Sequence, residues 1–141
     1  MNEWTYKGGP FPEPTMDLSE WWGFVYLIED RTTGKKYIGK KFFTKASSKQ
    51  VKGKRKKIRK TSDWLNYWGS NTTLQEEVKI KGVGAYTRNI LHLCRSKAEC
   101  SYYEAYEIFT RKALISDTYF NEWISCRIRK ANLPKLMNTV K

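Results

Sequence analysis

The order of apolar and polar positions along the chain predicts an α+β domain. Two short apolar runs, 22–29 and 36–43, flank a polar stretch at 30–35 whose Asp and Gly suit a turn. The runs are therefore expected to pair as antiparallel strands. Apolar residues alternate again over 86–94, which predicts a third strand.

Capping signals place the helices between and after these strands. A capping box predicts a helix over 73–82, and a second capping box precedes apolar residues at helical spacing over 98–115. We also expect a short turn at 64–68 and a final helix at 119–129. The order strand, strand, helix, strand, helix, helix indicates an α+β fold around a small sheet.

Length and composition fit one domain preceded by a short arm. Residues 1–20 are rich in Gly and Pro and are expected to form an irregular arm, which leaves 21–141 as a single domain. The sequence shows no secretory signal and no apolar run near the roughly 20 residues that span a bilayer, so we expect a cytoplasmic protein with no membrane partner. Three cysteines without C-x-x-C spacing favour neither disulfides nor zinc.

The net charge of +13 is concentrated in one segment. Between Arg31 and Lys60 there are 14 Lys and Arg and no acid, whereas the rest of the chain carries 13 basic and 14 acidic side chains. Repulsion within such a run predicts a basic loop, at 44–62, that orders on phosphate. Nuclear import signals and lipid tethers share this composition. A peripheral anchor would more naturally lie at a terminus, so a run inside the chain, directly after the two predicted strands, favours nucleic acid.

Two tyrosines on the paired strands give the segment its chemistry. Tyr26 ends Gly23-Phe24-Val25-Tyr26, and Tyr37 begins Tyr37-Ile38-Gly39, eleven positions later. An aromatic cross-strand pair can simply stabilise a hairpin. The spacing nevertheless resembles the GIY-YIG nuclease superfamily, whose fold is a small, three-stranded, mostly antiparallel sheet flanked by helices. The resemblance covers roughly 21–123 and implies an endonuclease that hydrolyses phosphodiester bonds in DNA.

The resemblance also implies a set of site residues. Glu104 occupies the position of the family's metal-binding glutamate, with Glu107 as the second choice, and Asn121 matches an element that positions the site. The implied cofactor is Mg²⁺, or Mn²⁺, held by Glu104. Tyr26 would act as general base or orient the attacking water, with Tyr37 nearby. Because a free phenol is a weak base, Lys40 and Lys41 are expected to favour the phenolate.

One family residue has no counterpart in this chain. The arginine expected about ten residues after the second tyrosine falls on Ser47. Arg55 or Arg59 could take its place if the basic segment is an insertion, and Lys41 could serve as a point charge. A chain lacking this cation could bind DNA or RNA without cutting it, and that is the alternative function. A third interpretation, a protein-interaction module with an acidic partner, also stays open.

The expected partner is therefore DNA, with a homodimer as a further possibility and a phage genome as the context that the resemblance suggests. His92, the single histidine, is expected to be structural or to face solvent. The candidate DNA contacts are cations of the basic segment together with two later polar residues: Lys40, Lys41, Lys49, Lys52, Lys54, Arg55, Lys56, Lys57, Arg59, Lys60, Asn71 and Arg88.

Overall fold

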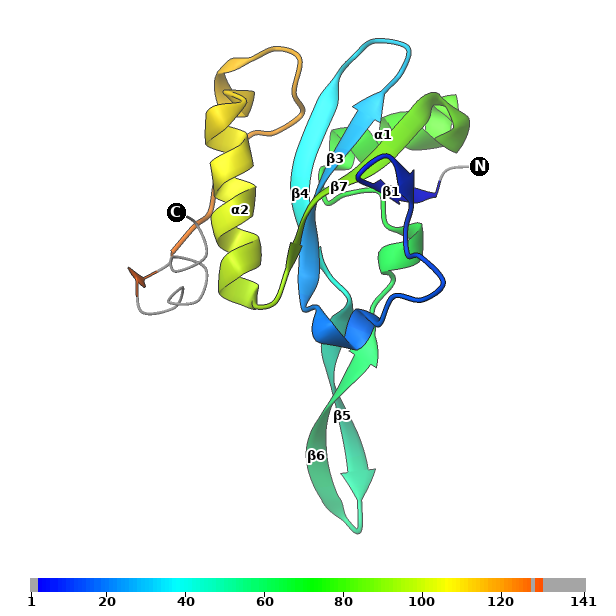
Figure 1. The fold of residues 1–141 in the computed structure, drawn as a ribbon, viewed down its shortest axis with the longest axis vertical. Coiled ribbons are helices and arrows are strands. Elements are labelled where there is room, and N and C mark those ends of the chain that lie inside the picture. The colour runs from blue at the N-terminus through cyan, green and yellow to red at the C-terminus, as the bar shows by residue number, and fades with distance from the viewer. Residues whose placement is uncertain (1–2, 128, 131–141) are drawn as a thin grey trace.

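A computed structural model describes residues 3–127 and 129–130. The described chain is an α+β fold in which a mixed sheet lies between helices and a long hairpin extends away from it (Figure 1). No helix among these residues is long and apolar enough to cross a membrane. The principal elements in chain order are β1 (Trp4–Tyr6), β2 (Gly9–Pro10), β3 (Gly23–Asp30), β4 (Lys36–Phe42), β5 (Thr44–Val51), β6 (Lys54–Thr61), α1 (Thr72–Lys81), β7 (Tyr86–Cys94) and α2 (Lys97–Thr110).

The three predicted strands form the antiparallel part of a larger sheet. The strand order is β2-β1-β7-β3-β4, with β3 antiparallel to both β4 and β7. The prediction of a three-stranded sheet is wrong in number, because β1 pairs in parallel with β7 and β2 pairs with β1. Part of the segment expected to be an irregular arm therefore belongs to the sheet.

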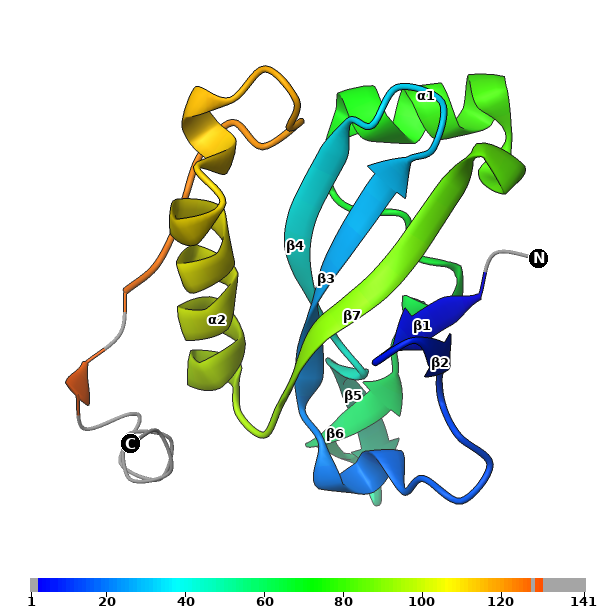
Figure 2. The ribbon, with the colours of Figure 1, turned by 45° about the horizontal axis from the view of Figure 1, so that its top comes forward.

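Each face of the central strands packs against different elements. Phe24, Tyr26 and Ile28 of β3 face a core that α1 helps to close. Val25 and Leu27 point to the opposite face, which α2 covers. Figure 2 shows α2 beside one face of β3, β4 and β7, while α1 lies beyond the other. This alternation follows from the two-residue period of a strand that is buried on both sides.

The segment predicted as a basic loop is a two-stranded hairpin. β5 and β6 pair along their whole length, from Thr44 opposite Thr61 to Val51 opposite Lys54, and form a separate sheet. The turn between them places Lys52 and Gly53 at positive φ. The charge pattern predicted a loop without regular structure, and the backbone hydrogen bonds between β5 and β6 give the segment a regular structure instead.

The helices begin at side-chain caps. The Asn71 side chain accepts from the Leu74 amide at the start of α1, so the capping box predicted at 73–76 is wrong, although the helix ends at Gly82 as expected. The Ser96 cap of α2 is confirmed, because its side chain accepts from the Glu99 amide. α2 ends at Thr110, short of the predicted 115, and the turn predicted at 64–68 is a 3₁₀ helix at Trp64–Asn66.

The final predicted helix, 119–129, is not formed in the described part of that range. Instead the segment after α2 lies along the outer edge of β4. The Lys36 amide donates to the Thr118 carbonyl at 2.8 Å, and the Phe120 amide donates to the Lys36 carbonyl at 2.7 Å. These bonds satisfy the backbone at the sheet edge, which a free helix would leave unpaired.

Candidate active site

Tyr26 and Tyr37 lie on adjacent strands and on one face of the sheet. Tyr26 is paired with Gly39, and Tyr37 is paired with Ile28. Because paired residues and alternate residues share a face, both rings project to the same side. Their ring centroids are 6.2 Å apart. The predicted placement of the two tyrosines on neighbouring strands is confirmed. Tyr26 is fully buried, however, and the cleft that Tyr37 and Glu104 line does not include Tyr26 among its lining residues.

Gly39 provides the space for this arrangement. A Cβ at Gly39 would overlap the Tyr26 hydroxyl and press on the Tyr37 ring. The Tyr26 side chain is fully buried, and its hydroxyl has no hydrogen-bond partner among the described residues. Burial, followed by the neighbouring Tyr67 and Tyr37 phenols, raises the pKa of Tyr26 well above that of a free phenol. An unpaired buried hydroxyl costs stability.

Tyr37 is the phenol that borders open space. Its hydroxyl lies 3.0 Å from the Ser70 Oγ, and the ring lines a cleft. Burial raises the pKa of Tyr37, and the hydrogen bond from Ser70 offsets only part of this effect. Both phenols are therefore protonated at neutral pH in this arrangement.

The neighbouring lysines do not favour the phenolate, contrary to expectation. Lys41 pairs with Asp63, with 2.6 Å between Nζ and Oδ1. Its ammonium also lies over the Tyr67 ring. Lys40 alternates to the opposite face of β4, where it pairs with Glu104. Each ammonium is thus directed to a carboxylate, and burial dominates the tyrosine pKa values.

Glu104 approaches the site from α2, on the other face of the sheet. Its Oε1 lies 3.6 Å from the Lys40 Nζ, which also donates to the Ser101 Oγ at 3.0 Å. Only 19% of the Glu104 side chain is exposed. Burial raises the pKa of Glu104, and Lys40 lowers it by less. The carboxylate is therefore only partly compensated by its single described ion-pair partner.

A cleft of about 400 Å³ brings the two faces together. β4 is the last strand of the sheet, so the cleft passes around its edge and holds Tyr37 on one wall and Glu104 on another. Lys40 is the single Lys or Arg among its described lining residues. The lining is Tyr37, Ile38, Lys40, Ser70, Asn71, Glu104, Ile108, Asn121, Glu122, Trp123 and Ser125.

Asn121 holds the edge of β4 at this cleft. Its side-chain oxygen accepts from the Ile38 amide at 3.0 Å, and its side-chain nitrogen donates to the Ile38 carbonyl at 2.8 Å. Asn71, predicted as a DNA contact, donates to the Phe120 carbonyl at 3.0 Å and also caps α1. Both amides therefore position the cleft walls through the backbone.

Arg88 does not lie in a position to contact DNA. It is 5% exposed, and its guanidinium lies between the Trp4 ring at 4.5 Å and the Trp68 ring at 4.2 Å. Its Nη1 donates to the carbonyl oxygens of Leu65 and Tyr67. Burial lowers the pKa of Arg88 to about 10. Arg88 is a core residue that ties β7 to the segment before α1.

The candidates for the missing arginine lie outside the cleft. Lys41 and Arg59 line a second cavity at the base of the hairpin, and Arg55 is exposed on β6. The side chain of Lys49 lies outside the described part of the structure. The other hairpin candidates are exposed on the turn or on β6: Lys52, Lys54, Lys56, Lys57 and Lys60.

Glu107 belongs to a separate ionic cluster. It accepts from Arg111 at 2.8 Å, and its other oxygen lies 2.7 Å from the His92 Nε2. The His92 ring stacks on Tyr103 with the centroids 4.2 Å apart. Glu107 is therefore committed elsewhere, and the structural role expected for His92 is confirmed.

Two cleft residues had no signal in the sequence. Ser70 reaches Tyr37 from the segment before α1, and Glu122 adds a second carboxylate to the lining. Glu104 and Glu122 are the carboxylates of the cleft that could hold a divalent cation, and one or two carboxylates suffice for Mg²⁺. Among the described residues, no group of three or more His, Cys, Asp or Glu forms a metal site.

Comparison with known proteins agrees with this geometry. The profile of the family described as "Putative endonuclease segE, GIY-YIG domain" matches residues 4–124. Neither the curated proteins nor the solved structures give a significant match. The matched range contains β1 to β7, both helices and the cleft residues up to Trp123. The chain therefore belongs to the SegE family of GIY-YIG domains.

Proposed function

We propose that the chain is a divalent-metal-dependent DNA endonuclease with its active site in the cleft at the edge of β4. The observation that carries the proposal is the meeting of Tyr37, Lys40 and Glu104 in one cavity, although they come from opposite faces of the sheet. Family membership supports nuclease chemistry at a general level.

The residues of the cleft suit a divalent cation. Glu104 is a buried carboxylate whose pKa is raised in spite of Lys40, so a stronger positive charge beside it would be favourable. Glu104, with Glu122 in the same lining, would hold Mg²⁺ or Mn²⁺. When bound, such an ion stabilises the charge that develops on the phosphoryl oxygens and on the leaving alkoxide.

The side chains of the chain itself supply positioning and charge. Lys40 is the cation at the cleft that can neutralise a phosphate oxygen, so it takes the role for which Arg55, Arg59 and Lys41 were considered. The Tyr37 hydroxyl, fixed by Ser70, can hydrogen-bond to the attacking water as a neutral phenol. Asn121 keeps β4, and hence Tyr37, in register with the cleft.

Nicking of supercoiled plasmid, with and without Mg²⁺, tests the proposal. Glu104→Gln is expected to lower the nicking rate at least about a hundredfold, while Glu76→Gln, an exposed acid on α1, leaves it unchanged. Absence of metal-dependent nicking in the wild-type chain, with DNA binding retained, would favour the non-catalytic binding protein instead. Equal losses in both variants would remove Glu104 from the reaction.

Tyr26→Phe separates chemistry from folding. Because the Tyr26 hydroxyl is buried and unpaired among the described residues, removing it should leave the unfolding free energy unchanged or raise it slightly. A fall in nicking without a fall in stability would show that this hydroxyl takes part in the reaction. A large loss of stability would contradict the unpaired state of the hydroxyl.

A further inference from the structure

The projecting hairpin has two unlike faces. Side chains of paired residues and of alternate residues share a face. Arg55, Lys57 and Arg59 of β6 therefore lie on one side, which we call the Arg59 face. Their partners on β5 are Gln50, Ser48 and Ala46. The cations of this face thus stand opposite uncharged side chains.

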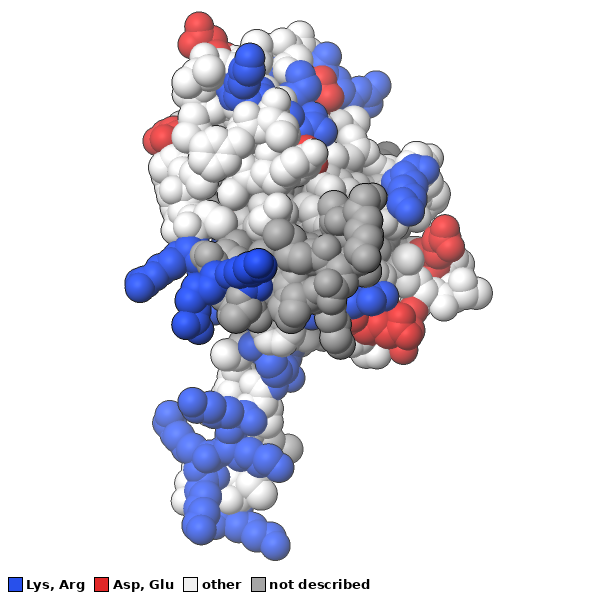
Figure 3. Space-filling view, turned by 60° about the vertical axis from the view of Figure 1, so that its left-hand side comes forward, with Lys and Arg blue, Asp and Glu red and all other residues white. Residues whose placement is uncertain are grey.

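The other side, the Ile58 face, carries Lys54, Lys56, Ile58 and Lys60 from β6. It includes the apolar Val51, which is paired with Lys54, and Ile58 is the one β6 residue that is not fully exposed. Lys45 of β5, paired with Lys60, adds a fourth described cation to this face, so the Ile58 face is the more basic of the two and also holds the apolar surface. Figure 3 shows Lys and Arg gathered over the hairpin, whereas the body in that view carries both signs of charge.

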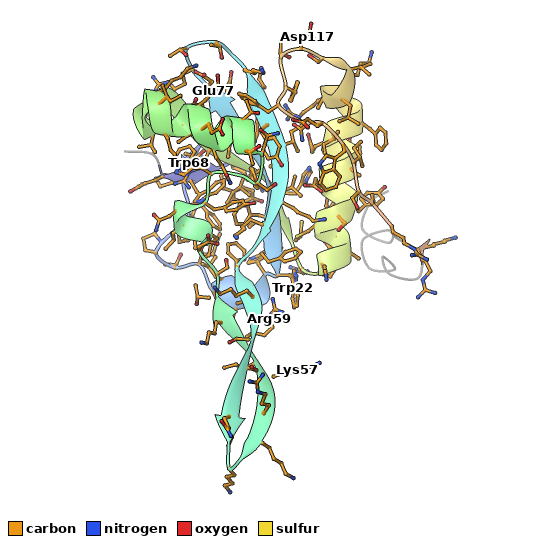
Figure 4. All side chains as sticks on the ribbon, turned by 180° about the vertical axis from the view of Figure 1, so that it is seen from behind. Trp22, Lys57, Arg59, Trp68, Glu77 and Asp117 are labelled. Atoms are coloured by element: carbon orange, nitrogen blue, oxygen red, sulfur yellow. The ribbon has the colours of Figure 1, made fainter. Side chains whose placement is uncertain are left out.

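The Arg59 face is the one that mainly continues into a groove on the body. Of the hairpin residues that line this groove, Thr44, Ala46 and Arg59 lie on the Arg59 face and Lys45 lies on the other. Arg59 donates to the Thr44 Oγ1 at 2.9 Å, and its guanidinium lies over the Trp22 ring at 4.5 Å. Figure 4 shows Arg59 beside Trp22 at the base of the hairpin, with Lys57 farther toward the tip. The second cavity, which we call the basic groove, opens at this point and has a volume of about 380 Å³.

The basic groove leads to the active-site cleft. It is lined by Trp22, Lys40, Lys41, Phe42, Thr44, Lys45, Ala46, Arg59, Ser62, Asp63 and Lys97. Asp63, its single described acid, is already paired with Lys41. Lys40 lines both the groove and the cleft, and Lys45 and Arg59 extend the basic lining of the groove to the hairpin. A phosphate chain is the ligand that matches such a path.

We propose that the Arg59 face of the hairpin enters the major groove of duplex DNA and that the basic groove holds the DNA backbone between the hairpin and the cleft. The inference rests on the proposed function, because it takes DNA as the substrate of the cleft. A two-stranded ribbon fits the major groove of B-form DNA, and its right-handed twist follows that groove. The deep, narrow major groove of A-form RNA excludes it.

The hairpin length sets the reach of this contact. Each strand has eight residues, which corresponds to about 26 Å at about 3.3 Å per residue. At about 3.4 Å per base pair this covers about 8 base pairs. Hydroxyl-radical footprinting should therefore show protection extending about 8 base pairs to one side of the cleavage position, and protection that is symmetric about that position would overturn the inference.

Two double variants of equal charge provide the main test. Arg55→Ser with Lys57→Ser removes two cations from the Arg59 face, and Lys54→Ser with Lys56→Ser removes two from the Ile58 face. All four side chains are exposed, and both variants keep the Arg59 contacts at the base. Binding to a DNA duplex of about 20 base pairs, two helical turns, is measured with EDTA so that cleavage does not interfere.

The Arg59-face variant should bind duplex DNA about tenfold more weakly. The slope of its log affinity against log salt concentration should fall by the equivalent of about two phosphate contacts. The Ile58-face variant should lose no more than about threefold. Equal losses for the two variants, or equal affinity of the wild-type chain for an RNA duplex of the same sequence, would overturn the inference. Lys97→Ser tests the basic groove, and Lys79→Ser on α1 is its control. If the two variants bind duplex DNA with equal affinity, the basic groove does not hold the DNA backbone.

These measurements separate the inference from the proposed function. Metal-dependent nicking with no difference between the hairpin faces would overturn this inference alone. A difference between the faces with no nicking under any metal condition would overturn only the endonuclease. A DNA duplex bound more tightly than RNA and in a face-dependent manner supports the inference in either case.

Discussion

β3 and β6 are both eight residues long, yet they differ in how far their side chains are buried. Seven of the eight residues of β3 are buried, whereas seven of the eight of β6 are exposed. Packing on both sides specifies the residues of β3. Nothing packs on most of β6, and an isolated two-stranded hairpin is only marginally stable. Packing therefore does not specify the identities of its residues, and we attribute them to the proposed contact with DNA.

The largest expected effect comes from removing the hairpin. Replacing residues 44–61 with a short Gly linker is feasible, because the Ser62 amide donates to the Phe43 carbonyl at 2.9 Å and closes the base. The unfolding free energy should change by no more than about 1 kcal/mol, while affinity for duplex DNA should fall about a thousandfold at low salt. Urea denaturation and anisotropy titration measure the two. If the variant cannot fold, the hairpin is required for the fold, and the contrast between β3 and β6 is wrong.

Arg88→Met should affect the body alone. Removing a buried guanidinium that lies between two indoles and donates to two carbonyl oxygens should cost about 3 kcal/mol of unfolding free energy. The folded fraction should bind DNA normally. Arg95→Met is the control, since Arg95 is exposed and lies over a single ring. A loss of affinity without a loss of stability would restore Arg88 as a DNA contact.

Gly39→Ala tests whether the body positions the active site. The added methyl group would overlap the Tyr26 hydroxyl and should lower the unfolding free energy by about 2 kcal/mol, as overpacking of a core does. Nicking should fall as well, because Tyr37 shares this space. Gly84→Ala has no atom within 4 Å of the new methyl and should be neutral in both assays. Similar behaviour of the two variants would contradict the close packing at Gly39.

The smallest expected effect is a shift in the pH dependence of nicking, measured on the residual activity that remains after Lys40→Met removes the cation proposed to neutralise the phosphate. Burial raises the pKa of Glu104, and Lys40 lowers it in part, so Lys40→Met should raise that pKa further. In the proposed mechanism activity requires the ionised carboxylate and is lost as pH falls through this pKa. The acidic limb of the nicking profile should therefore move to higher pH. Lys36→Met, whose partner is Glu29, should leave the limb in place. If the acidic limb does not move in Lys40→Met, Lys40 does not lower the pKa of Glu104.

The sequence was sufficient for the features that local pattern controls. The pairing of β3 with β4, and with it the approach of Tyr26 to Tyr37, follows from alternation and a turn. The Ser96 cap and the Gly82 stop are likewise local signals. The helix that carries Glu104 was predicted from its cap and its apolar spacing, and the role of Glu104 from the family resemblance. No local signal showed that this helix would pack over β4.

Long-range contacts account for what the sequence did not show. Residues 119–129 look helical in isolation, but their first part gains backbone bonds to Lys36 that a helix could not make. The charge of Arg88 favoured a contact with DNA. It is a core residue because the indoles of Trp4 and Trp68, from other segments of the chain, pack against its guanidinium. Ser70 and Glu122 reach the cleft in the same non-local way.

The pairing of residues 118–121 with β4 also protects the sheet from self-association. The backbone bonds at Lys36 and the amide of Asn121 at Ile38 occupy polar groups that an outermost strand would otherwise offer to another chain. The same short segment that supplies a wall of the cleft thus closes a surface on which strands of a second molecule could add. Protection of the sheet edge and the shape of the candidate active site consequently depend on the same few hydrogen bonds.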